Sequence, residues 1–104
     1  MIVLTTLGAQ TDAAAFARVL VDERLAACVN ILPVMTSVYR WKETIEEDRE
    51  QQLVIKTTSD RVEALEARLH ELHPYELPEF LVVAATEASA GYMKWLEESL
   101  IPDP

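Results

Sequence analysis

Polar and apolar residues follow two periods along the chain, one typical of strands and one typical of helices. Nearly continuous apolar runs at 1–7 and 80–86 predict two buried strands. The segment 26–42 is rich in Val, Ile and aromatic residues and predicts a long strand. After a polar stretch the chain becomes apolar again at 53–57, so we expect a hairpin that turns near residues 42–44 and returns as a second long strand.

Three other segments repeat apolar residues every three or four positions, which is the spacing of an amphipathic helix. The first runs from about residue 13 to Leu25, and the last follows residue 89. The middle helix should end at His73, because the proline at 74 disfavours helical geometry in the residue before it. The side chains able to cap these helices are Thr11 or Asp12, Asp60 and Ser89.

The order of these elements is βαββαβ followed by one more helix. This order is typical of a ferredoxin-like α+β fold, in which an antiparallel four-stranded sheet carries helices on one face. A length of 104 residues fits one domain, so we assign residues 1–104 to a single domain.

The predicted hairpin is too long for one compact domain. Such a domain has a radius of gyration of about 13 Å, whereas an unbroken strand from Cys28 to Trp41 would span about 45 Å. Pro33 indicates a bulge or an edge position, but part of the hairpin, including Val38 and Tyr39, should still overhang. Exposed strand edges with aromatic side chains favour pairing with another chain, so we expect a closed homo-oligomer.

Composition narrows the classes of partner. The formal net charge of −9 argues against nucleic acid and anionic membranes, which require clustered Lys and Arg, and it permits cations. The two glycines exclude a glycine-rich phosphate loop, and the single cysteine, Cys28, excludes an internal disulfide. The opening apolar run lacks a basic lead, and no run approaches the roughly 18 residues of a membrane span. We therefore expect a cytoplasmic location.

Five segments together resemble one known family. They are LAACVNILP at 25–33, SVYRWK at 37–42, LVIKT at 53–57, HPYELPE at 73–79 and GYMKWL at 91–96. On these segments, which cover nearly the whole chain, the sequence is similar to the CutA family, named for divalent cation tolerance. The resemblance implies a ferredoxin-like homotrimer built through the long hairpins, with an architecture similar to the PII signalling proteins. It also implies an association with tolerance to copper and other divalent metals, and no enzymatic activity.

The resemblance also implies a metal ligand. Members of the family bind copper through a histidine of this motif, so His73 is a candidate ligand for Cu²⁺ or another divalent cation. Leu72 and Thr5 stand where some members have a second histidine and a cysteine. Cys28 is the only soft ligand in the chain and is the second candidate. The alternatives are that His73 ends its helix and that Cys28 packs as a small apolar residue.

A cleft between subunits is another candidate site, because the PII-like architecture places small-molecule sites there. The residues that could line it are Tyr39, Trp41, Lys56, Tyr75, Glu76 and Glu79. The alternative for the aromatic residues is packing within a subunit interface. Pro74 and Pro78 stiffen the corner between helix and strand.

Other groups of side chains are less specific. In the acidic run 46–50, strand alternation puts Glu46, Asp48 and Glu50 on one side, where a solvated hairpin explains them better than a Ca²⁺ or Mg²⁺ site. His70 could chelate a metal with the histidine three residues on, if the helix persisted that far. Acylphosphatases share this general fold type and length, but they bind phosphate through an arginine-based cradle. The early loop of this chain has no arginine, so we exclude that class of enzyme.

The candidate sites and the family resemblance leave three possible functions. The leading one is a cytoplasmic, non-enzymatic homotrimer connected with divalent metal tolerance that binds Cu²⁺ or a similar cation. The alternative is a PII-like signalling or interaction module whose clefts bind a small ligand or a partner segment. The third is an enzyme of unknown reaction that uses Lys56, Glu76 and Glu79.

Overall fold

The structure is a computed structural model that describes residues 1–102, so the last two residues of the predicted domain lie outside the described range. Along the chain the elements are β1 (Ile2–Gly8), α1 (Ala13–Asp22), β2 (Cys28–Ile31), β3 (Met35–Trp41), β4 (Thr44–Lys56), a 3₁₀ turn (Ser59–Arg61), α2 (Val62–Leu72), β5 (Leu81–Val83) and α3 (Ala90–Ser99). This is the predicted order, with the long second strand divided into β2 and β3.

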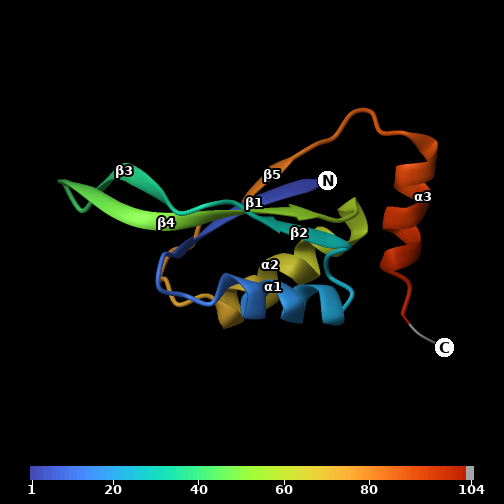
Figure 1. Ribbon diagram of the computed structural model, residues 1–104, viewed down its shortest axis with the longest axis horizontal. Helices are drawn as coiled ribbons and strands as arrows, with labels where there is room; N and C mark the ends of the chain where they lie inside the picture. The colour runs from blue at the N-terminus through green and yellow to red at the C-terminus, as the bar shows by residue number, and fades with distance from the viewer. Residues whose placement is uncertain (103–104) are drawn as a thin grey trace.

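The strands form one antiparallel sheet in the order β2-β4-β1-β5, and β3 continues along β4 beyond β2. β4 thus lies between β1 and β2, as the ferredoxin-like fold requires. Figure 1 shows α1 and α2 on one face of the sheet and α3 at the end of the molecule opposite the hairpin. The predicted ferredoxin-like α+β fold is confirmed.

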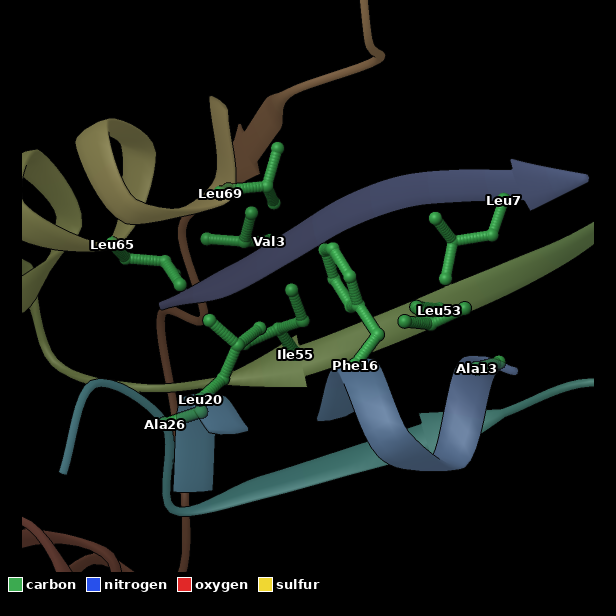
Figure 2. Packing of buried hydrophobic residues seen from close by; sticks show 10 residues of the cluster. All are labelled: Val3, Leu7, Ala13, Phe16, Leu20, Ala26, Leu53, Ile55, Leu65 and Leu69. Carbon is green, nitrogen blue, oxygen red and sulfur yellow. The ribbon is translucent and has the colours of Figure 1, made fainter. Parts of the chain in front are cut away.

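The hydrophobic core lies between the sheet and the helices α1 and α2, and Figure 2 shows its side chains pointing toward one another. The sheet contributes Val3, Leu7, Leu53 and Ile55, and the helices contribute Phe16, Leu20, Leu65 and Leu69. Because alternate residues of a strand face opposite sides, the odd-numbered residues of β4 point into this core. Its even-numbered residues lie on the opposite side, which we call the open face of the sheet.

α1 begins where it was predicted and ends earlier. Asp12 caps it, since the carboxylate accepts a hydrogen bond from the backbone N–H three residues on at 3.0 Å. The helix stops at Asp22 rather than near Leu25, because Arg24 has a φ of 61° and the Leu25 N–H turns back to the Leu20 carbonyl. This is a Schellman cap, in which glycine usually supplies the left-handed residue.

Asp60 does not cap α2, so that prediction is wrong. The residue lies in the turn Ser59–Arg61, where its carboxylate accepts a hydrogen bond from the Thr58 hydroxyl. α2 begins one residue after this turn, at Val62, without a side-chain cap. The Asp60 carboxylate accepts a hydrogen bond from Thr58, two residues before it, instead of from a backbone N–H of α2.

Pro33 lies between β2 and β3, and the pairing with β4 shifts by one residue across it. Ile31 is opposite Leu53, whereas Met35 is opposite Glu50. One extra residue on the proline side makes this a β-bulge, which is one of the two alternatives predicted for Pro33. Since successive residues of a strand face opposite sides, the bulge brings the odd-numbered residues of β3 to the open face.

The hairpin turns at Lys42 and Glu43, whose φ angles of 48° and 70° are those of a two-residue loop with a left-handed backbone. β1 ends opposite Glu50, so the part of β4 before this residue pairs only with β3. We call β3 and this part of β4 the hairpin arm. The molecule is 47 Å long but only 28 × 23 Å across, with a Cα radius of gyration of 14.6 Å. The predicted overhang is confirmed.

β5 differs from the buried strand predicted at 80–86. Only Leu81–Val83 pair with β1, and all three residues are exposed. β5 is an edge strand of the sheet, and α3 stands away from it (Figure 1). The prediction of a buried strand is wrong for the single chain, which has an apolar patch at this edge.

Candidate ligand cleft beside the hairpin

A cavity of about 930 Å³ opens where the hairpin arm meets the end of β1 and the loop that follows α2. We call it the cleft. One wall is the open face of the sheet, with Met35, Ser37, Tyr39 and Trp41 from β3 and Asp48, Glu50 and Gln52 from β4. The other walls are the loops 8–11 and 75–79. The cleft therefore joins residues from four separate parts of the sequence.

His73 joins α2 to the loop behind the cleft. Its backbone is extended, with φ of −78° and ψ of 132°, as the following proline favours, and the residue is only 7% exposed. Nδ1 accepts a hydrogen bond from the Tyr75 N–H at 3.1 Å, so Nε2 carries the proton and donates to the Thr6 carbonyl at 2.7 Å. Burial lowers the pKa of His73. The ring is neutral and both nitrogens are engaged.

Tyr75 reaches from the loop to β4. Its hydroxyl donates to Glu50 Oε2 at 2.8 Å, and its ring centre lies 4.8 Å from that of His73. Burial, followed by the hydrogen bond to Glu50, raises the pKa of Tyr75, so the hydroxyl keeps its proton. The hydroxyl also lies beside Gly8, where a Cβ would be in ordinary van der Waals contact with the hydroxyl oxygen, at 3.4 Å.

Tyr39 makes a similar contact farther along the hairpin arm. Its hydroxyl donates to Asp48, and this hydrogen bond raises the pKa of Tyr39 to about 12. Trp41, on the same face of β3, has the Lys42 ammonium 5.5 Å from its ring centre, within the range of a cation–π contact. The arm thus places aromatic rings beside carboxylates.

Two glutamines hold the cleft walls together. Gln52 Nε2 donates to the Thr5 carbonyl at 2.7 Å and to Glu79 Oε2 at 2.9 Å, which fixes the loop 75–79 against β4. Gln51 Nε2 donates to the Gly8 carbonyl at 3.1 Å, which fixes the end of β1. These contacts join segments distant in sequence, so the cleft is part of the folded domain rather than a gap between mobile loops.

The predicted cleft residues that line this cavity are Tyr39, Trp41, Tyr75, Glu76 and Glu79. Lys56 lies elsewhere, at the far end of β4, where its Nζ donates to Asn30 Oδ1 at 2.5 Å. Lys56 is also opposite Cys28 in the β2–β4 register, and the Cys28 Sγ lies 3.9 Å from the same Asn30 oxygen. The polar group on β2 is therefore separate from the cleft in this chain.

His73 and Cys28 do not meet in one chain, because they lie on different elements with different partners. Across residues 1–102, no three side chains of His, Cys, Asp or Glu gather in a way that could hold a metal ion. A metal at His73 would first have to displace the hydrogen bond at Nδ1 or the proton at Nε2. The assignment of both residues as metal ligands stays a prediction.

Sequence reasoning missed the central position of Glu50 in the cleft. The residue is only 7% exposed, although the acidic run around it indicated a solvated hairpin. Strand alternation in β4 had already put Asp48 and Glu50 on the same side. The burial of Glu50 could be inferred only from the register of β3 and from the contact with Tyr75, which is 25 residues away in sequence.

The sequence matches the family model of the CutA1 divalent ion tolerance protein over residues 1–99. The chain belongs to the CutA1 family. A Thermus thermophilus protein named divalent-cation tolerance protein CutA is 43% identical over 98 residues, which cover 94% of this chain and 95% of the relative. The solved PII-like protein CutA from Nostoc sp. PCC 7120 has a TM-score of 0.88 at 34% identity and covers 96% of both chains.

A human relative, protein CutA, is 43% identical over 82 residues, which cover 79% of this chain but only 46% of the relative. The chain thus spans nearly all of the bacterial relative and less than half of the human one. CutA1 membership confirms the resemblance found in the sequence, and the fold is shared with a CutA protein described as PII-like. Within residues 1–102 no helix has the length and apolar character needed to cross a bilayer.

Proposed function

We propose that this CutA1 protein is a cytoplasmic homotrimer that contributes to divalent cation tolerance, binds a divalent cation such as Cu²⁺ and catalyses no reaction. The observation that supports the assembly is the hairpin arm, which extends beyond the domain with exposed Val38 and Ile45. On the open face, Leu81 and Val83 are 55% and 47% exposed. Exposed apolar side chains on a projecting hairpin and on an edge strand are typical of a subunit interface.

The assembly is tested by light scattering and sedimentation equilibrium at micromolar concentration. We expect a mass three times that of the 11.7 kDa chain. Val83→Asp should dissociate the trimer, because it puts a charge into the proposed apolar interface. Val21→Asp is the matched control, since Val21 is similarly exposed, at 39%, on α1 in the other layer. A monomeric native protein, or equal dissociation by both variants, would contradict the proposal.

Cation binding is supported by the charge of the chain and of the cleft. The net charge is −9, and Asp48, Glu50, Glu76 and Glu79 all line the cleft. An acidic hollow raises the local concentration of cations. The predicted ligands His73 and Cys28 are tested by calorimetric titration of Cu²⁺ and Zn²⁺ into the native protein and its variants.

The variants for this titration are His73→Ala and Cys28→Ala, with His70→Ala as the control histidine. His70 is exposed on α2, and its ring forms a hydrogen bond with the Glu66 carbonyl of the same helix. Loss of binding in one of the first two variants alone would identify the ligand. Unchanged heat and stoichiometry in both would remove His73 and Cys28 from the proposal.

A second candidate function is a PII-like module that binds a small ligand in the cleft. The observation that favours it is the size and lining of the cavity, since about 930 Å³ with aromatic rings and a few convergent polar groups is typical of a small-molecule site. A thermal-shift screen of nucleotides, amines and metabolites tests this role. Stabilisation that disappears in Tyr75→Ala would support it, and no stabilisation by any compound would count against it.

A further inference from the structure

Glu50 is the most buried carboxylate that lines the cleft. It is only 7% exposed, and its Oε2 accepts one hydrogen bond, from Tyr75. In the described part of the chain no hydrogen bond reaches Oε1, and no Lys or Arg pairs with this carboxylate. Burial of a carboxylate is unfavourable unless a cation compensates it. A positive charge in the cleft would therefore be stabilised.

The basic side chains of the chain do not supply that charge. Arg49 is the one basic residue that lines the cleft within residues 1–102. Strand alternation puts its side chain on the face of β4 opposite to Asp48 and Glu50. No basic side chain of residues 1–102 therefore compensates the Glu50 carboxylate, and a cation that enters the cleft would do so.

Asp48 repeats the arrangement of Glu50 two residues away on the same face of β4. Tyr39 donates to Asp48 just as Tyr75 donates to Glu50. Two residues of a strand advance by about 6.7 Å, so the two carboxylates form a pair at a fixed spacing. A ligand with two positive charges joined by a short chain could contact both at once.

The surfaces beside these carboxylates are apolar and aromatic. Met35 and Leu77 line the cleft together with the rings of Tyr39 and Trp41. The Trp41 ring already attracts an ammonium group, that of Lys42 at 5.5 Å. Such walls suit methylene groups and alkyl ammonium ions. A bare metal ion is less well matched, because no group of three metal-ligating side chains occurs in the described residues.

We propose that the cleft binds an aliphatic diamine or polyamine, with one ammonium group at Glu50 and the next at Asp48. The alkyl chain between the two nitrogens lies along β4, against Tyr39 and Met35. This inference rests on the second candidate function, which makes the cleft a ligand site, and it names the chemical class of that ligand.

Calorimetry with putrescine and spermidine on the native protein at low ionic strength is the test. We expect both amines to bind, and n-butylamine to bind about tenfold more weakly because it has one charge for two carboxylates. Glu50→Gln and Asp48→Asn should each weaken putrescine binding about tenfold, since each amide keeps an acceptor for its tyrosine but loses the charge. Asp48 is exposed, so its variant tests the proposal even where Glu50→Gln loses stability.

Glu47→Gln is the matched control, because it removes the same charge from the opposite face of the same strand. Putrescine affinity should be unchanged in this variant. Equal weakening by Glu47→Gln and Glu50→Gln, equal affinity for n-butylamine, or displacement of putrescine by equimolar Mg²⁺ would each overturn the proposal. Light scattering on the same samples reports the assembly separately. A trimer without amine binding contradicts this inference alone, and a monomer contradicts the proposed assembly.

Discussion

Replacement of His73 by alanine should destabilise the folded protein through lost internal contacts, whether or not the residue ever binds a metal. His73 is only 7% exposed, and its ring links three parts of the chain. It donates to the Thr6 carbonyl in β1 and accepts from the Tyr75 N–H in the loop. It also packs edge-on against Phe16 of α1, with ring centres 5.9 Å apart.

The magnitude follows from these contacts. The two hydrogen bonds contribute about 1 kcal/mol each, and their loss leaves the Thr6 carbonyl and the Tyr75 N–H without these partners. Removal of a buried ring that packs against two aromatic side chains adds about 1–2 kcal/mol. We therefore expect His73→Ala to lower the free energy of unfolding by about 3 kcal/mol per chain.

Urea unfolding followed by circular dichroism measures this change. The protomer concentration is held constant, because the stability of an assembly depends on it. For a domain of this size, about 3 kcal/mol corresponds to a fall in the urea midpoint of about 2 M. His70→Ala is the control, since His70 is exposed and its ring forms a hydrogen bond within its own helix. The control should change stability by less than about 0.5 kcal/mol.

Equal urea midpoints for His73→Ala and His70→Ala would contradict a structural role for the His73 contacts. The joint result with the metal titration then separates two roles. Loss of stability with unchanged Cu²⁺ binding makes His73 a structural residue of the loop. Loss of Cu²⁺ binding with unchanged stability makes it a ligand whose hydrogen bonds contribute little to folding.

Three further predictions use the same unfolding assay. Because burial lowers the pKa of His73 in the folded chain below its ordinary 6.5, the unfolded chain binds this proton first, and stability should fall by up to about 1.4 kcal/mol per pH unit below pH 6.5; the slope should be smaller in His73→Ala. Lys42→Asn with Glu43→Gly should raise stability by about 1 kcal/mol, because both positions have positive φ. Leu65→Ala, at a fully buried site, should cost about 3 kcal/mol; a loss under 1 kcal/mol would contradict the assigned core.

The elements of the fold could be predicted because local patterns specify them. Strand and helix periods gave the order of elements and the hairpin turn, and side-chain type gave Asp12 as one of two possible caps of α1. The end of α1 was missed because its cap depends on a left-handed backbone at Arg24. An arginine, unlike a glycine, does not indicate such a backbone in the sequence. β5 was expected to be buried from its apolar residues, but the burial of an edge strand depends on what packs against it and not on the strand's own residues.

The cleft could be predicted in part. Tyr75, Glu76 and Glu79, which line the cleft, were predicted from the segment HPYELPE. Its two prolines indicate a rigid corner, and its polar side chains can be read from that segment alone. Lys56 was placed with them, although the register puts it at the other end of β4. Glu50 was missed because its burial depends on a tyrosine from a different loop. Contacts of this kind are a property of the tertiary structure.

The bulge at Pro33 is a local feature with a consequence for the tertiary structure, because it decides which side chains the hairpin arm presents to the cleft. In the register of β2, Tyr39 would lie opposite Ile45, on the side of the odd-numbered residues of β4. The one-residue shift puts it opposite Glu46 instead, on the same face as Asp48 and Glu50. Without the shift, the arm would present Val38 and Arg40 to the cleft instead. Valine has no group that binds a cation, and arginine would repel one. The aromatic and acidic lining therefore depends on one extra residue at the proline.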